Sequence, residues 1–133
     1  MVTGGEALLL YTTQKTVGGV YLESNHHYQV ANDLSQVIGV AYDGLNIFWT
    51  DITHRSESIV KALEDGSKRE IVVSSGLGAP EDICIDFLTG NIYFTDSMQS
   101  HIAMCSNDGK HCTILINENV HRPRGVVLNP KSG

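Results

Sequence analysis

Phe48-Trp49-Thr50-Asp51 is followed 45 residues later by Tyr93-Phe94-Thr95-Asp96, so an aromatic pair with Thr-Asp occurs twice in the chain. The turn pair Asp65-Gly66 also returns, 43 residues later, as Asp108-Gly109. Landmarks that share a spacing of about 40 to 50 residues indicate one supersecondary unit that is repeated. Such a unit cannot bury its apolar face alone, so neighbouring copies must stack against each other.

A third landmark has the same period. Residues 80–86, Pro-Glu-Asp-Ile-Cys-Ile-Asp, return 43 residues later as residues 123–129, Pro-Arg-Gly-Val-Val-Leu-Asn. Counted from these landmarks, the chain divides into a degenerate first repeat over 1–36, a second over 37–79, a third over 80–122 and the start of another over 123–133.

Nearly every apolar stretch is short, rich in β-branched or aromatic residues and bounded by Gly, Asn, Asp or Pro, which is typical of strands. We therefore predict an all-β protein with four strands in each repeat. The first strands are predicted at 37–42, 83–87 and 126–128, the second at 8–12, 47–51 and 92–96, the third at 20–22, 59–63 and 101–105, and the fourth at 28–30, 69–73 and 112–116. Closed propellers have about 4 to 8 blades, so we interpret the chain as about three four-stranded antiparallel blades of a β-propeller.

The composition argues against two classes of partner. The net charge is −6 over 133 residues, and the nine basic residues form no stripe of the kind that binds nucleic acid. No apolar run approaches the roughly 18 residues that a membrane span needs, so we expect no direct membrane contact.

The two aromatic motifs resemble the Tyr-Trp-Thr-Asp (YWTD) motif of the six-bladed propellers in low-density-lipoprotein-receptor-like proteins, known as LDL-receptor class B repeats. The run that begins at Pro80 and the Asp-Gly pairs fall where that family has them. The resemblance is weak over the first 35 residues and strong from about Val37 to Pro130. Within the family, residues 104–112 resemble arthropod vitellogenin (yolk-protein) receptors. About three blades of a six-bladed ring are therefore expected.

The resemblance implies a non-catalytic ectodomain module of an endocytic receptor for lipoproteins or vitellogenin. The expected partners are proteins: cargo held through neighbouring modules, and the EGF-like and small Cys-rich repeats of the same chain. The expected location is the extracellular side of the cell surface and endosomes, within a single-pass membrane receptor. The alternative is an extracellular propeller of a matrix or signalling protein, nidogen-like or Wnt-coreceptor-like, that binds a protein partner without endocytosis.

The repeated motif itself has a structural and a functional interpretation. Asp51 and Asp96 are candidate carboxylates for chemistry, yet an Asp at a strand end readily accepts backbone N–H bonds, and one in each repeat suits a scaffold. Phe48 and Trp49 are a candidate stacking platform, as are Tyr93 and Phe94. Neighbours in a strand point to opposite faces, so we expect each aromatic pair to pack against both adjacent blades instead.

Six histidines give the chain a possible response to pH between 5 and 8. The resemblance gives this idea weight, because such receptors release cargo in acidic endosomes. Our preferred sensor is His121, which precedes Arg122-Pro123-Arg124, followed by His54 and His101. The remaining histidines are His111 and the pair His26-His27, which we place in an irregular turn.

Chemistry of other kinds finds little support in the sequence. No His-x-x-x-His or Cys-x-x-Cys spacing predicts a metal site, and no Gly-x-Ser-x-Gly or phosphate-binding Gly loop predicts catalysis. Glu81 and Asp82 could belong to an axial site of the kind found in lactonase propellers, but their counterparts Arg124 and Gly125 could not help them. We expect no enzyme activity, no catalytic residue and no cofactor.

Cys105 and Cys112 flank the turn pair Asp108-Gly109. If this pair forms a two-residue hairpin turn, Cys105 lies directly opposite Cys112, with Cα atoms about 4.5 to 5.5 Å apart. That separation is within the range of a disulfide. We therefore predict a Cys105–Cys112 disulfide and an oxidising compartment, with Cys84 left as a free thiol.

Overall fold

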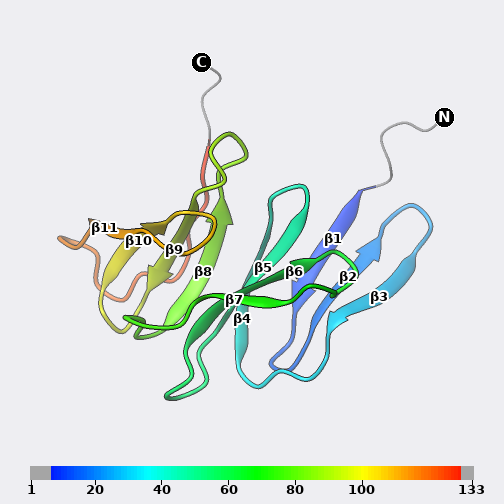
Figure 1. Ribbon diagram of the computed structural model, residues 1–133, viewed down its shortest axis with the longest axis horizontal. Coiled ribbons are helices and arrows are strands. Elements are labelled where there is room, and N and C mark those ends of the chain that lie inside the picture. Colours follow the sequence, from blue (N-terminus) through cyan, green and yellow to red (C-terminus); the bar gives the residue numbers. More distant parts are fainter. Residues whose placement is uncertain (1–6, 130–133) are drawn as a thin grey trace.

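The structure is a computed structural model that describes residues 7–129. This part of the chain contains strands and no helix, so it has no helix that could cross a membrane (Figure 1). The strands are β1 (Leu8–Thr12), β2 (Val17–Tyr21), β3 (His26–Ala31), β4 (Val37–Tyr42), β5 (Asn46–Asp51), β6 (Ser58–Leu63), β7 (Glu70–Val73), β8 (Pro80–Ile85), β9 (Ile92–Asp96), β10 (His101–Cys105) and β11 (Cys112–Ile116).

The strands form three antiparallel sheets, in the orders β1-β2-β3, β4-β5-β6-β7 and β11-β10-β9-β8. Every strand pairs with its neighbour in sequence, so each sheet is a meander of the kind that forms a propeller blade. The sheets follow one another in space as in the sequence, with the second sheet between the first and the third (Figure 1). Within residues 7–129, the first sheet has three strands and no first strand before β1, in line with the predicted strand positions.

Two apolar clusters join the three sheets. The first interface, between the first and second sheets, is built from Val17, Val30, Ala31, Val37, Ile47, Trp49, Val60 and Ala62. The second interface, between the second and third sheets, is built from Phe48, Ile59, Val73, Ile83, Ile85, Ile92, Phe94, Ala103 and Cys105. The second sheet therefore has both faces covered, whereas one face of the third sheet has no neighbouring sheet in this structure.

Six predicted strands have different bounds in the structure, and the starts of β2 and β8 differ most. β2 begins at Val17 and not at 20, because Gly18 and Gly19 extend it: a Cβ on Gly18 would lie 2.6 Å from the Tyr11 ring, and one on Gly19 would lie 2.8 Å from the Tyr28 ring. These glycines lengthen the strand by giving two tyrosine rings room. β8 spans Pro80–Ile85, and residues 86–87 belong to the turn that follows it.

The strand predicted at 126–128 is absent, because no strand within residues 7–129 is placed to pair with it. Residues 123–129 have no regular secondary structure. The segment still lies against the third sheet, since the Val126 amide donates to Asp82 Oδ2 at 2.8 Å and the Thr95 hydroxyl donates to the Arg124 carbonyl at 3.3 Å.

The Asp-Gly pairs form longer turns than predicted. The Gly66 amide donates to the Leu63 carbonyl and the Gly109 amide to the Ser106 carbonyl, both at 2.8 Å, so each glycine ends a β-turn instead of occupying its centre. Both have positive φ, 88° and 76°. In this hairpin connection a β-turn is followed by a residue in the left-handed conformation, which glycine adopts without strain.

The turn of the first sheet contains no glycine. Asn25 adopts a positive φ of 59°, which asparagine tolerates. His26 and His27 lie in β3, so the prediction that placed them in an irregular turn was wrong.

Candidate functional site

The threonines of the repeated motif tie each sheet to the next. Thr50 Oγ1 accepts a hydrogen bond from the Gly39 amide at 2.9 Å and donates to the Glu81 carbonyl of the third sheet at 2.8 Å. In the first sheet, Thr12 occupies the strand position that corresponds to Thr50, and its Oγ1 donates to the Ile38 carbonyl at 2.7 Å. Because Thr50 is fully buried, its hydroxyl serves the packing of the sheets and is not available to a substrate.

The aspartates of the motif accept hydrogen bonds from backbone amides. Asp96 is fully buried, and its carboxylate accepts from the Gly78, Ala79 and Gln99 amides at 2.7, 2.9 and 3.0 Å. Asp51 accepts from the Thr53 amide at 2.8 Å. These contacts fix the loops at one end of the sheets, which favours the structural interpretation of both side chains.

The aromatic pairs divide between the two interfaces. Trp49 packs in the first interface and Phe48 in the second, and both are fully buried. Phe94 also packs in the second interface. Tyr93, which corresponds to Phe48, is half-buried because no sheet covers its face in this structure.

Cys105 and Cys112 form a disulfide between directly opposite residues of β10 and β11, with Cα atoms 4.0 Å apart. The register matches the one predicted, although the turn between them is longer. Cys84 in β8 is a free, half-buried thiol. Burial, with the nearby Asp82 carboxylate, raises the pKa of the Cys84 thiol above its usual value.

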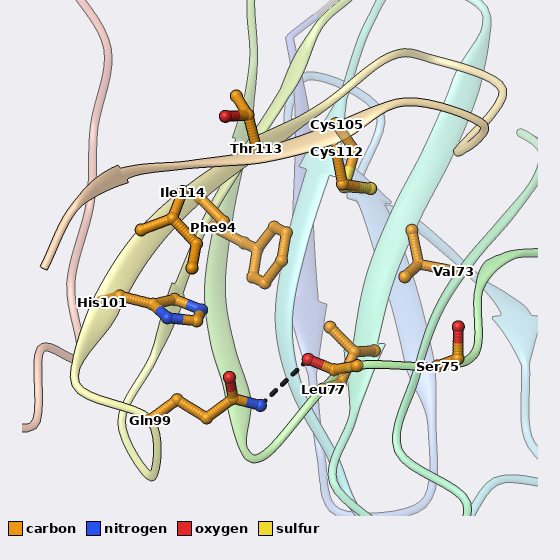
Figure 2. Close-up of a pocket in the computed structure, with 12 residues that line it drawn as sticks. Val73, Ser75, Leu77, Phe94, Gln99, His101, Cys105, Cys112, Thr113 and Ile114 are labelled. Carbon is orange, nitrogen blue, oxygen red and sulfur yellow. Dashed lines mark hydrogen bonds between the residues drawn. A yellow bond between two sulfur atoms is a disulfide. The ribbon is translucent and has the colours of Figure 1, made fainter.

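An open cavity of about 500 Å³ lies at the outer end of the second interface, next to the disulfide (Figure 2). Val73 and Leu77 border it from the second sheet and the loop after it, and Phe94 and Ile114 border it from the third sheet. The Gln99 side chain crosses one end and donates to the Gly76 carbonyl at 2.9 Å (Figure 2). The buried His101 ring lies at the same end, between Ile114 and Gln99 in the view of Figure 2.

The three histidines proposed as pH sensors differ in exposure. His54 and His121 are exposed in loops, whereas His101 is buried at the start of β10, opposite Asp96. The Arg122 amide donates to the Ser100 hydroxyl at 3.2 Å, which brings the loop of His121 to the residue before His101. His54 follows β5 in the second sheet and does not share this contact.

A second pocket, of about 300 Å³, was not predicted from the sequence. It is lined by Tyr21, His26 and Tyr28 of the first sheet and by Glu64 and Asp65 of the turn after β6. The Tyr21 hydroxyl donates to Glu64 Oε1, and the Tyr42 hydroxyl donates to Glu64 Oε2 at 2.9 Å. The only sequence signal was the presence of Tyr21, Tyr28 and Tyr42 at positions with no aromatic counterpart in the later repeats.

Glu81 and Asp82, considered for an axial site, have partners within the fold. Glu81 forms an ion pair with Arg124 at 3.2 Å and accepts a hydrogen bond from the Ser97 hydroxyl. Asp82 accepts hydrogen bonds from the Val126 and Ile83 amides. Within residues 7–129, no group of three or more His, Cys, Asp or Glu residues is arranged to hold a metal ion.

Comparison of the sequence with curated proteins finds receptors. The chain is 54% identical over 132 residues to the vitellogenin receptor Yl of Drosophila melanogaster and 33% identical over 132 residues to the vitellogenin receptor of Solenopsis invicta. It is 31% identical over 133 residues to the low-density lipoprotein receptor-related protein 5 of Mus musculus. These matches cover 95–97% of the chain but only 7–8% of the length of the relatives. No protein-family model matches the chain.

Comparison with solved structures finds propellers. The nidogen chain of a nidogen/laminin complex superposes with a TM-score of 0.83 at 28% identity, over 92% of this chain and 49% of that chain. A gluconolactonase from Xanthomonas campestris superposes with a TM-score of 0.66 over 80% of this chain and 36% of that chain. At 19% identity the second likeness shows the fold alone.

Proposed function

Because the chain belongs to the YWTD β-propellers of the low-density-lipoprotein-receptor family, we propose that it is part of the ectodomain of an endocytic vitellogenin or lipoprotein receptor. The observation that carries this proposal is the 54% identity to a vitellogenin receptor over nearly the whole chain. The proposed role of the chain is non-catalytic, because the motif residues pack the sheets together and hold the loops in place. The proposed location is the extracellular side of the cell surface and endosomes, in a single-pass membrane protein.

The proposed partners of this propeller are proteins. Lipoprotein or yolk-protein cargo is held by neighbouring modules, and EGF-like and Cys-rich repeats of the same chain adjoin the propeller. The disulfide between Cys105 and Cys112 supports an oxidising compartment. No cofactor is required for this role.

The test is uptake of labelled vitellogenin by cells that display the full-length protein. Cells with the intact protein should bind cargo at pH 7, internalise it and release it at pH 5. A matched protein without the propeller should still bind at pH 7 but release less at pH 5. Failure of the intact protein to bind vitellogenin or any lipoprotein would refute the proposal.

The propeller could contribute to release through its histidines. His54 and His121 are exposed and can become protonated beside an acidic module, which then competes with cargo. Arg122 and Arg124 add positive charge next to His121, whereas burial of His101 limits its contact with a partner. Replacing His121 and His54 by Gln in the whole receptor should slow release at pH 5, with His111→Gln as the control. Unchanged release would remove these residues as sensors.

A second candidate is a matrix or signalling propeller that binds a protein without endocytosis. The likeness to the nidogen chain, a partner of laminin in that structure, and to the lipoprotein-receptor-related protein favours it. The two candidates differ in what accompanies the propeller in the full-length protein. A membrane span followed by a functional internalisation signal supports the receptor, and secretion without either supports the matrix protein.

A further inference from the structure

The pocket between the first two sheets combines aromatic rings with carboxylates. Tyr21 stacks on His26, with ring centroids 6.3 Å apart, and on Tyr28, with centroids 5.7 Å apart. The rings share one face of the β2–β3 hairpin, and Glu64 and Asp65 close the pocket from the second sheet. Aromatic faces and carboxylates both attract a cation.

The carboxylates of this pocket have no cationic partner in the described part of the chain. Its ion pairs are Arg69–Asp33 and Arg124–Glu81, and neither includes Glu64 or Asp65. Glu64 is half-buried. Its hydrogen bonds come from neutral tyrosine hydroxyls, which leave the negative charge uncompensated. A half-buried charge without a counter-ion is costly, so binding of a cation would be favoured.

Burial and the Glu64 carboxylate together raise the pKa values of two of these tyrosines. Burial, and then the hydrogen bond to Glu64 and its charge, raise the pKa of Tyr42 to about 12. Burial, followed by the charge of Glu64, also raises the pKa of Tyr28 above its usual value. The charge of Glu64 contributes to both pKa shifts and stabilises a positive group placed among the phenols, whereas burial opposes a charge of either sign there.

The free hydrogen-bonding capacity decides what kind of cation fits. The Tyr28 hydroxyl is buried beside the Tyr21 hydroxyl and accepts no hydrogen bond from an N–H donor of the described residues. It can accept a hydrogen bond, as can the remaining lone pairs of the Glu64 carboxylate. A cation with N–H donors satisfies these acceptors, whereas a quaternary ammonium has no hydrogen to donate.

We propose that the pocket formed by Tyr21, Tyr28 and Glu64 binds a primary ammonium or guanidinium group on an apolar stem. The lysine or arginine side chain of a partner protein carries such a group, and so does a free alkylamine. The stem lies along the tyrosine rings and the charged end meets Glu64. The third sheet lacks this site because Asn107 stands where the second sheet has Glu64.

The test uses adjacent histidines that face opposite sides of β3. His26 lines the pocket and is exposed, so His26→Lys places a fixed positive charge at its mouth without disturbing the core. His27→Lys adds the same charge at the next residue, which does not line the pocket. The probes are n-butylammonium, lysine acetylated at its α-nitrogen as the methylamide (acetyl-lysine methylamide, with a free side-chain ammonium) and tetramethylammonium. Each is titrated into the full-length protein and both variants, and binding is followed by ligand-observed NMR.

Both N–H cations should bind the original protein and the His27→Lys variant with equal affinity. The affinity of tetramethylammonium for the original protein should be at least about tenfold weaker, and so should the affinity of both N–H cations for the His26→Lys variant. Glu64→Gln should lose binding as well, while the thermal unfolding midpoint reports whether that variant is folded. Binding of acetyl-lysine methylamide as well as butylammonium identifies a protein side chain as a source. Binding of butylammonium alone identifies a free amine. Equal binding to His26→Lys and His27→Lys, or equal binding of tetramethylammonium, overturns the proposal.

Discussion

The two inter-sheet interfaces use corresponding positions but fill them differently. In the first, Trp49 lies opposite Val60 across β5 and β6, and Arg69 lies over the Trp49 ring at 5.7 Å. In the second, the corresponding pair is Phe94 opposite Ala103, and Cys112 stands at the position of Arg69. The second interface has smaller side chains at all three positions, and the cavity of Figure 2 lies beside them.

The comparison separates what the repeat requires from what one blade adds. Both interfaces keep buried β-branched and aromatic residues, because the sheets cannot be stable without covering each other. The polar groups Tyr21, Glu64 and Arg69 lie around the first interface, whereas the second has the neutral Asn107 at the position of Glu64 and Cys112 at that of Arg69. Chemistry specific to this protein is therefore concentrated at the edges of the interfaces and not in the motif.

Truncation of the aromatic pair should show that its two members belong to different interfaces. Trp49→Ala and Phe48→Ala each remove a fully buried ring, and we expect each to lower the free energy of unfolding by about 3 to 5 kcal/mol. Amide hydrogen exchange should locate the damage, in β1–β3 for Trp49→Ala and in β8–β10 for Phe48→Ala. Loss of protection in the same sheet for both variants would contradict the assignment.

Removal of the disulfide should affect the second interface alone. Closure of a loop of about eight residues stabilises a protein by about 2.5 kcal/mol in the chain-entropy description. Cys105→Ser with Cys112→Ser should lower the free energy of unfolding by about that amount and increase exchange in β11. Cys84→Ser is the matched control, because this thiol is free. Peptide mapping under non-reducing conditions must first find the Cys105–Cys112 bond; two free thiols in secreted protein would refute the prediction.

Filling the cavity should make the second interface resemble the first. Phe94→Trp with Ala103→Val restores the side chains that the first interface has at these positions, and cavity-filling changes commonly add about 0.5 to 2 kcal/mol. We expect the thermal unfolding midpoint to rise. Leu115→Val on β11 is the control, since Leu115 does not border the cavity. A lower midpoint would mean that the cavity is too narrow for the indole ring.

The sequence predicted the parts of the fold that depend on the repeat. All eleven observed strands overlap predicted ones, because alternating apolar residues and turns mark them in the sequence. The prediction for β3 was too short at both ends, and at its start the reason is that the two histidines of β3 look polar. The strand at 126–128 was predicted wrongly because pairing needs a partner that local pattern does not reveal.

The pocket of Tyr21, Tyr28 and Glu64 was not predicted, for a related physical reason. Tyr21 and Glu64 are 43 residues apart in sequence and belong to neighbouring sheets, and they meet because one sheet packs beside the next. The chemistry at such a meeting point is visible only when the sheets are placed together.

The smallest expected effect concerns the ion pair at the edge of the first interface. Arg69 donates to both carboxylate oxygens of Asp33, at 3.2 and 3.0 Å, and this hydrogen bonding, with the charge of Arg69, holds the pKa of Asp33 below its usual value of 3.8. A lowered pKa in the folded state means that the pair stabilises the fold above the unfolded-state pKa. The contribution disappears as pH falls through the lower folded-state value. Both side chains are substantially exposed, so the effect is small.

Asp33→Asn should therefore be slightly less stable than the original chain at pH 5 to 7 and equal to it near pH 2. The measurement is urea unfolding of both proteins across this range at low salt, because salt screens exposed pairs. Asp43→Asn is the control, since Asp43 accepts turn amides and has no ion-pair partner among residues 7–129. A stability difference for Asp33→Asn that persists unchanged to pH 2 would show that Asp33 acts through the shape of its loop. The first interface would then be held by Trp49 and its apolar neighbours without help from the charge.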